Sequence, residues 1–312
     1  MPPPGELSLP ESVDCLGLGI APADILMRIR EFPRPGKKID ALETVIQGGG
    51  PIPTAMVTVA RLGFRSALIA KVGNDVFGDF VIAELKQEKV DTSHIIRSHH
   101  TTAIASGWVE NDSGRRTISL ELQVKVKPSE IKLKTLPETK LIHLDARDLS
   151  ASLKLARYGR RTKIPVSLDV GSMRNDVSEI IPLVDHFVCA EDFALPFTKS
   201  KDVENALKRL SKICPGTIVI TSGIKGSKGM DKTGRIVTQK AYKVKTIDTT
   251  GAGDSFHGAY LVGLLKGWDL ARRLEFASAV AALKCTQMGG RTAIPNMRRV
   301  NRFLKSRTKK HD

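Results

Sequence analysis

The chain reads Ile247-Asp248-Thr249-Thr250-Gly251-Ala252-Gly253-Asp254-Ser255-Phe256 directly before an apolar stretch that ends at Leu265. Gly251 and Gly253 let the backbone approach a ligand closely, because neither residue carries a Cβ atom. The apolar stretch is typical of a helix, and the free N–H groups at a helix N-terminus attract anionic oxygens. The segment therefore predicts a strand end, a tight loop and a helix start that together bind an anion.

Asp254 lies at the mouth of this loop. A carboxylate there could accept the proton of a hydroxyl that attacks phosphorus, while the loop holds the charge of the transferring phosphoryl group. Alternatively, Asp254 only caps the helix, since acidic residues stabilise helix N-termini. The short motif alone favours the capping role, so the choice depends on the rest of the chain.

Short β-rich runs alternate with amphipathic helical stretches before this segment, and helices follow it. Such alternation predicts an α/β fold of three layers, with a mostly parallel central sheet flanked by helices. The expected strands are 13–19, 66–72, 141–145, 166–170, 186–190 and 217–222, and the expected helices are 51–62, 77–89, 150–158, 203–213, 251–265, 270–287 and 297–305.

Two places interrupt the alternation with strand-like pairs that have no helix between them. They predict a small antiparallel sheet that projects from the main one, with lid segments at about 24–46 and 101–122. A chain of 312 residues with 41% hydrophobic content suits one large domain. We therefore predict a disordered leader over 1–12, a single α/β domain over 13–306 and a basic tail over 307–312.

The formal net charge of the chain is +16. A basic surface attracts nucleotides, phosphorylated metabolites and nucleic acids. Part of the charge is confined to the C-terminal segment, where such a run is usually a solvated helix face and tail. Aromatic residues make up 5% and do not interleave with the basic ones, so the composition argues against a nucleic-acid partner. The basic residues of this segment are Arg298, Arg299, Arg302, Lys305, Arg307, Lys309 and Lys310.

The longest nearly unbroken apolar run, 259–265, is too short to span a bilayer, so no membrane contact is expected. The four cysteines show no C-x-x-C spacing, which predicts buried free thiols in a reducing compartment. Together these features predict a cytoplasmic protein. The cysteines are Cys15, Cys189, Cys214 and Cys285.

Two motifs, about two hundred residues apart, resemble the signatures of the PfkB/ribokinase family of carbohydrate kinases, and two motifs in the expected order are stronger evidence than one. The C-terminal motif is the Asp248-to-Asp254 segment followed by Phe256 and Gly258. The N-terminal motif consists of Gly49-Gly50, Ala60-Arg61-Leu62-Gly63, Lys71-Val72-Gly73-Asn74-Asp75 and Gly78. Intervening stretches match as well, so the resemblance covers nearly the whole chain.

The resemblance implies an ATP-dependent and Mg²⁺-dependent kinase whose lid closes over a sugar-like substrate and makes a homodimer contact. By residue, it implies an anion hole of Gly251, Ala252 and Gly253 with Asp254 as general base; sugar contacts from Asp24, Gly49 and Gly50; nucleotide contacts from Thr221, Gly223 and Gly226; and a monovalent cation such as K⁺ near Asp248, Thr250 and the carbonyl of Gly289.

Three positions depart from the family pattern. Pro22 and Thr54 stand where Asn often binds the sugar, so a different hydroxyl pattern is expected. The family's Asn-x-x-Glu motif is replaced after the 186–189 strand by Ala190-Glu191-Asp192-Phe193. Glu191 either holds Mg²⁺ through water or is a first-turn acid of a helix.

Arg174 follows a predicted strand at its carboxyl end, where open α/β sheets bind ligands. It either binds an anionic substrate or forms a surface salt bridge. If Arg174 faces the pocket, a sugar phosphate or a sulfo-sugar is a candidate acceptor. The Gly-Pro-x-x-Thr-Ala loop that begins at Gly50 and the Glu-Asp-Phe-Ala segment that begins at Glu191 resemble those of family members that act on fructose-type and sulfo-sugar substrates.

Two alternatives stay open: a nucleoside kinase of the same fold, and a non-catalytic relative with a regulatory or nucleic-acid-associated role. A nicotinamide-binding fingerprint at Gly17-Leu18-Gly19 is rejected, because Pro22 replaces its third glycine and no helix follows directly.

Overall fold

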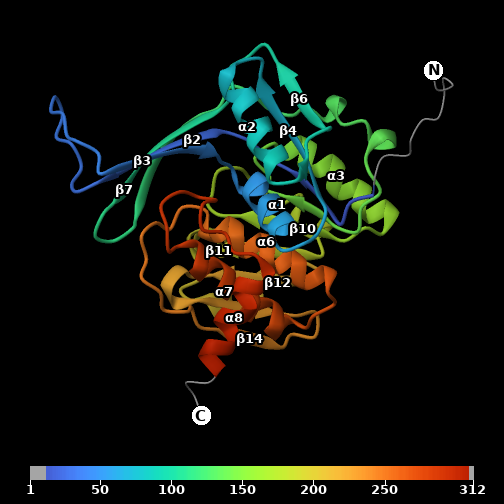
Figure 1. Cartoon of the computed structure of the whole chain (residues 1–312). Helices are drawn as coiled ribbons and strands as arrows, with labels where there is room; N and C mark the ends of the chain where they lie inside the picture. Colours follow the sequence, from blue (N-terminus) through green and yellow to red (C-terminus); the bar gives the residue numbers. More distant parts are fainter. Residues whose placement is uncertain (1–11, 309–312) are drawn as a thin grey trace, which may run out of the picture.

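Alternating side chains of the central strands pack on both faces of one sheet. The computed structural model describes residues 12–308, so positions 1–11 of the predicted leader and 309–312 of the predicted tail lie outside the described residues. In β11 (His186–Ala190), Phe187 and Cys189 join the core on one face and Val188 joins the core on the other. This period of two produces a three-layer α/β fold, as the sequence predicts (Figure 1).

The central sheet has ten strands in the order β14-β13-β12-β11-β10-β9-β1-β4-β5, with β6 also paired to β4. All neighbouring pairs are parallel except β12–β13 and β13–β14 at one edge. The remaining strands are β1 (Cys15–Leu18), β4 (Ser66–Gly73), β5 (Val90–Asp91), β6 (Ile95–Ser98), β9 (Ile142–Leu144), β10 (Val166–Val170), β12 (Thr217–Thr221), β13 (Ser227–Met230) and β14 (Ile236–Gln239).

Eight helices within residues 12–308 cover the two faces of this sheet. The first face carries α1 (Pro51–Arg61), α2 (Val76–Gln87), α6 (Ala252–Leu265), α7 (Leu270–Lys284) and α8 (Met297–Thr308). The opposite face carries α3 (Leu149–Thr162), α4 (Glu191–Thr198) and α5 (Val203–Leu210). Short 3₁₀ turns lie at Pro128–Glu130, Leu133–Thr135, Ile181–Leu183 and Gly223–Lys225.

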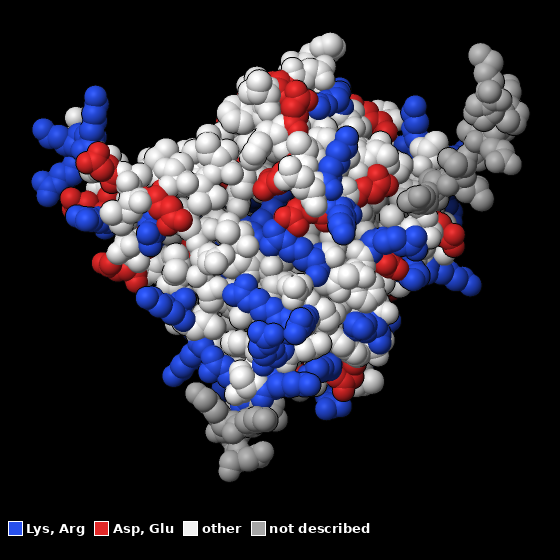
Figure 2. Space-filling view, in the orientation of Figure 1, with Lys and Arg blue, Asp and Glu red and all other residues white. Residues whose placement is uncertain are grey.

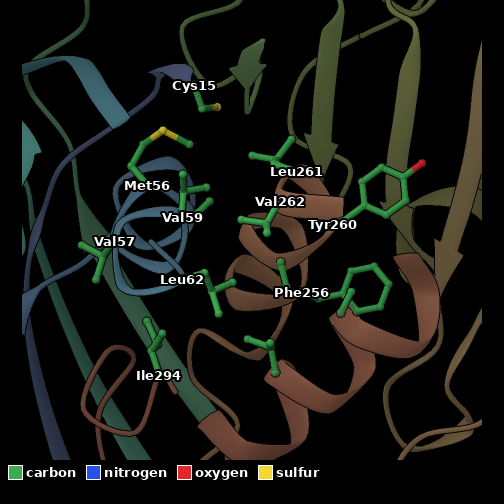
Figure 3. Close-up of a cluster of buried hydrophobic side chains, with 14 of the residues drawn as sticks. Cys15, Met56, Val57, Val59, Leu62, Phe256, Tyr260, Leu261, Val262 and Ile294 are labelled. Atoms are coloured by element: carbon green, nitrogen blue, oxygen red, sulfur yellow. The ribbon is translucent and has the colours of Figure 1, made fainter. Parts of the chain in front are cut away.

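Helices α1 and α6 pack closely on each other, with Val59 and Leu62 facing Leu261 and Val262 (Figure 3). Gly258 permits this approach, because a Cβ atom there would lie 2.5 Å from the Cβ of Thr58. Each buried aliphatic side chain contributes roughly 1.5–3 kcal/mol. This packing fixes the position of the α6 N-terminus, where the glycine loop lies.

A second, four-stranded sheet projects from the main body (Figure 1). Its order is β3-β2-β7-β8, from β2 (Ala23–Ile29), β3 (Glu43–Gly48), β7 (Ile104–Glu110) and β8 (Arg116–Glu121). Pairs β2–β3 and β7–β8 are antiparallel, but β2 and β7 run parallel. The expectation of wholly antiparallel pairing is wrong for that central pair.

The carboxyl ends of the parallel strands meet at one edge of the main sheet, which is where open α/β sheets bind ligands. Within residues 12–308, no helix combines the length and the apolar character needed to cross a bilayer. All four cysteines are buried and free, as expected.

Candidate active site

The glycine loop opens α6 without a side-chain cap. Gly251 occupies the N-cap position with φ +73°, and a Cβ there would lie 2.5 Å from the carbonyl oxygen of Gly290. By contrast, no atom lies within 4 Å of a Cβ built on Gly253. The N–H of Ala252 donates to the Thr249 carbonyl oxygen at 3.2 Å, and the open space beside Gly253 leaves room for an anion at the helix N-terminus.

Asp254 is the third residue of α6 rather than its cap, and it is half-buried. Burial and the nearby charge of Asp169 raise the pKa of Asp254, whereas Arg116 opposes the rise. The Arg116 guanidinium, on β8 of the four-stranded sheet, lies 3.4 Å from the carbonyl oxygen of Thr249 in the loop. A carboxylate with a raised pKa beside an uncapped helix N-terminus has the properties of a general base for phosphoryl transfer.

Three further polar side chains lie buried behind the base. His257, one turn along α6, places its Nε2 3.1 Å from Oδ1 of Asp169 on β10. Burial raises the pKa of Asp169, but the neighbouring His257 and His143 outweigh it and leave the pKa below its ordinary value. Donor atoms of His143, Asp169 and His257 lie within 4.8 Å of one another, so this cluster has the composition of a metal site.

The predicted sugar-binding residues lie at the start of β2 and directly after β3 of the four-stranded sheet. Asp24 is buried on β2, and a Cβ on Gly49 would lie 1.9 Å from its Oδ1. Gly50 has φ +90°, and its Cβ would lie 2.2 Å from the Ile20 carbonyl oxygen. Burial raises the pKa of Asp24 to about 7; Arg291 opposes this shift and Asp254 adds to it. Asp24 and Asp254 therefore act on each other across one site.

Arg291 connects the loop of Gly49 and Gly50, here called the sugar loop, to the rest of the site, and its side chain is only 2% exposed. Its Nη2 donates to the Gly49 carbonyl at 2.8 Å, and its Nη1 lies 3.3 Å from Oε2 of Glu84. Its Nε donates to the Thr54 hydroxyl at 3.3 Å. The predicted substrate-binding hydroxyl of Thr54 is thus already bonded within the protein.

Acidic and basic side chains line the edge where β9 and β10 end. Asp145 follows β9, burial raises its pKa to about 7, and its Oδ2 is buried without a hydrogen-bond partner. A Cβ on Gly19 would lie 2.5 Å from that oxygen. Burial lowers the pKa of Arg147, and the charge of Arg174 lowers it further. The two arginines are therefore neighbours.

Arg174 itself is exposed, and its Nε donates to the Ser172 hydroxyl at 3.2 Å. Within residues 12–308, no ion pair of Arg174 is present, so the surface salt bridge considered from the sequence is not formed there. Its guanidinium is available to an anionic ligand.

The predicted nucleotide segment follows β12. Thr221 ends the strand, Gly223 opens a 3₁₀ turn with no atom near its Cβ position, and Gly226 has φ +99° where a Cβ would lie 2.0 Å from the Gln239 carbonyl oxygen. Ile224, in the same turn, is 97% exposed. An apolar side chain beside open glycine backbone suits contact with a purine base.

Glu191 begins α4, with Asp192 beside it in the first turn. The Glu191 carboxylate lies 3.4 Å from Nζ of Lys225. The structure therefore shows first-turn acids, one of them ion-paired, and the role of Glu191 toward Mg²⁺ stays a prediction.

The three predicted cation-site residues come together. Both carboxylate oxygens of Asp248 accept backbone N–H groups, from Thr250 at 2.7 Å and from Gly289 at 2.8 Å. This arrangement joins the glycine loop to the 285–291 segment.

Six titratable residues of the site were not identified from the sequence. A charge beside or inside an apolar run was the available signal for most of them, such as an acid directly after a strand or a lysine near the end of an apolar helix. They are Arg116, Asp145, Arg147, His257, Lys284 and Arg291.

Comparisons with known proteins agree with this geometry. The ribokinase of Haemophilus influenzae is 27% identical over 92% of this chain and 97% of its own length. The 5-dehydro-2-deoxygluconokinase of Halalkalibacterium halodurans is 24% identical over 96% of both chains. The structure of Arabidopsis thaliana ribokinase complexed with ribose and ATP superposes with a TM-score of 0.81, at 22% identity over 94% of this chain and 99% of that one.

Residues 14–297 match the pfkB family of carbohydrate kinases, a span that includes both the glycine loop and the sugar loop. The chain therefore belongs to the pfkB family of carbohydrate kinases.

Proposed function

We propose that this protein transfers the γ-phosphoryl group of ATP to a hydroxyl of a sugar or sugar-like molecule. The observation that carries the proposal is the uncapped α6 N-terminus with Asp254 beside it, within electrostatic reach of buried Asp24. Asp24 would orient the acceptor, Asp254 would take the proton of its hydroxyl, and the loop 251–253 would hold the transferring charge. Mg²⁺, bound with ATP, supplies charge neutralisation at the phosphates.

The acceptor side of the site favours a polyhydroxylated molecule with an anionic group. Asp24 and Asp145, both with a pKa raised to about 7 by burial, can accept or donate hydrogen bonds to sugar hydroxyls. Arg147 and Arg174 lie at the same edge and could bind a phosphate or sulfonate. We therefore favour a sugar phosphate or sulfo-sugar over ribose as the acceptor. Pro22 and Thr54 stand at the positions where Asn often binds the sugar, which also argues against ribose.

A coupled ADP-release assay with Mg–ATP tests this proposal across neutral sugars, sugar phosphates, sulfo-sugars and nucleosides. We expect one sugar class to raise ADP release at least tenfold above hydrolysis without acceptor. The Arg147→Gln variant should raise KM for anionic acceptors more than for neutral ones, and Arg157→Gln, an exposed residue on α3, serves as its control. Preference for nucleosides would replace the carbohydrate assignment with the nucleoside-kinase alternative.

The regulatory alternative rests on the basic surface. Lys and Arg side chains gather over the lower part of the view in Figure 2, where Figure 1 places α7 and α8. If no acceptor supports turnover, and duplex or RNA binding falls steeply with salt, that alternative is preferred.

We also infer a homodimer through the lid. Of nine large hydrophobic side chains exposed within residues 12–308, five lie on the lid strands or on the β2–β3 connection: Phe32, Ile39, Leu42, Ile46 and Ile118. Three of these residues lie on the connection, and Ile46 and Ile118 lie on the two edge strands, β3 and β8. Exposed apolar residues concentrated in one part of a fold support a protein–protein contact there.

Sedimentation velocity at micromolar concentration should therefore give the mass of a dimer. Ile46→Lys on β3 should shift it to a monomer, whereas Ile213→Lys, outside the lid and similarly exposed, should not. A monomeric wild-type protein would rule out this contact.

A further inference from the structure

Lys284 is a fully buried lysine in the wall of the glycine loop. It ends α7, is 0% exposed, and donates from Nζ to the main-chain carbonyl of Asp248 at 2.9 Å. Burial lowers the pKa of Lys284, while the acidic groups of Asp248 and Asp254 favour its charged form. A buried ammonium is costly unless oxygens and negative charge compensate it. Its position beside Asp248 supplies that compensation.

The family resemblance implies a monovalent cation at this position beside Asp248. The oxygens of Asp248 do not fit that role here. Both carboxylate oxygens already accept N–H groups, and the carbonyl oxygen already accepts the ammonium of Lys284. A second positive charge at these oxygens would be repelled by the ammonium in a buried, weakly screened site. The Lys284 ammonium therefore already supplies the positive charge beside Asp248, while the buried hydroxyl of Thr250, another predicted ligand, has no hydrogen-bond partner.

The contacts of Asp248 indicate what a cation beside it would do. Its carboxylate holds Thr250 N on one side and Gly289 N on the other, and Gly251 lies against the Gly290 backbone. The shape of the glycine loop thus depends on how Asp248 joins these two segments. A positive charge at the Asp248 carbonyl balances the buried carboxylate and fixes this junction.

We propose that the Lys284 ammonium is a built-in cation that replaces an exchangeable monovalent ion and holds the glycine loop in the conformation that binds phosphate. The proposal rests on the proposed function for the role of the loop in phosphate binding. Lys284 is a positioning residue, because it acts on the phosphate only through Asp248 and the loop.

The first test compares the wild-type protein in KCl, NaCl and choline chloride at equal ionic strength. We expect the Kd for a non-hydrolysable ATP analogue with Mg²⁺, and the thermal unfolding temperature, to be the same in all three salts, with less than a twofold change in Kd. A saturable gain of tenfold or more in affinity, or a rise in unfolding temperature, that is specific to K⁺ would overturn the proposal.

The second test removes the charge. Lys284→Met should weaken analogue binding at least tenfold in choline chloride, and Lys284→Ala, which leaves space, should recover part of that loss in KCl. Lys245→Met, an exposed lysine shortly before the loop, should bind as the wild type does. Unchanged affinity of Lys284→Met in choline chloride would contradict the proposal.

Should the Lys284 variants fail to fold, the salt comparison on the wild-type protein decides the matter alone. Binding and unfolding also need no acceptor. Lack of turnover with every acceptor would therefore count against the proposed function, whereas K⁺-dependent unfolding would count against Lys284 as the built-in cation.

Discussion

Asp254→Asn is expected to lower kcat by about 10²–10⁴-fold, the usual contribution of a positioned general base. The substitution keeps the shape of the side chain but removes its ability to take a proton. Because Asp254 is half-buried and is not the N-cap of α6, the fold should tolerate the change. Isothermal titration with an ATP analogue should show nearly unchanged binding, so the loss belongs to the chemical step.

The pH dependence gives this prediction a second readout. A general base works when deprotonated, so kcat/KM should fall as the pH drops through the pKa of Asp254. Burial and Asp169 raise that pKa above its ordinary value of 3.8, which moves the acid limb upward. The residual rate of Asp254→Asn should lack this acid limb, and its pH dependence should come only from the titration of Asp24.

Asp269→Asn is the matched control, because Asp269 caps α7 through a 2.8 Å bond from Arg272 N. Asn caps helices about as well as Asp, so Asp269→Asn should change stability by less than about 0.5 kcal/mol and leave kcat unchanged. If Asp254→Asn behaved like Asp269→Asn, the capping interpretation of Asp254 would be the correct one.

Local pattern was sufficient for the buried strands and for the glycine loop. The runs 166–170 and 186–190 coincide with β10 and β11, because the first alternates apolar and polar residues and the second is apolar from Phe187 to Ala190. The short strands β13 and β14 at one side of the sheet were missed, since four-residue strands carry little periodicity. Helix α4 was considered only as an alternative, because it is eight residues long and contains Pro196.

The remaining features depend on contacts between distant segments. The parallel pairing of β2 with β7 joins Asp24 to Ala105, and no local signal specifies such a pair. In the same way, nothing around Asp169 in the sequence announces that His257 will lie 3.1 Å away. A motif predicts the residues that meet the phosphate, whereas the residues that tune and hold them are defined by the fold.

Arg291→Met is expected to destabilise the protein by about 1–3 kcal/mol, because it removes a buried hydrogen-bond donor and the partner of the partly buried Glu84 carboxylate. The Gly49 carbonyl loses a 2.8 Å donor, and Glu84 keeps only its bond from Gly48 N. Asp24 also loses the cation that holds its pKa down, so more of it will be neutral at pH 7. Urea unfolding at pH 7 measures the effect.

Arg298→Met on the exposed face of α8 is the control, and it should change stability by less than about 0.5 kcal/mol. Arg291→Lys should retain part of the stability but raise KM for the sugar, since an ammonium cannot replace the planar fork that contacts Gly49 and Glu84 together. A loss below about 1 kcal/mol in Arg291→Met would show that the site does not depend on this residue.

The double variant Arg291→Met with Glu84→Gln separates the charge pair from the backbone contact. If the stranded carboxylate causes most of the loss, the double variant should be more stable than Arg291→Met alone, with a coupling of about 0.5–3 kcal/mol. If the Gly49 contact dominates, the two changes should add. In the second case the sugar loop itself needs the guanidinium, and KM for the acceptor should stay high in the double variant. Arg291 would then determine the position of Gly49 and Gly50 directly, with Glu84 only orienting its side chain.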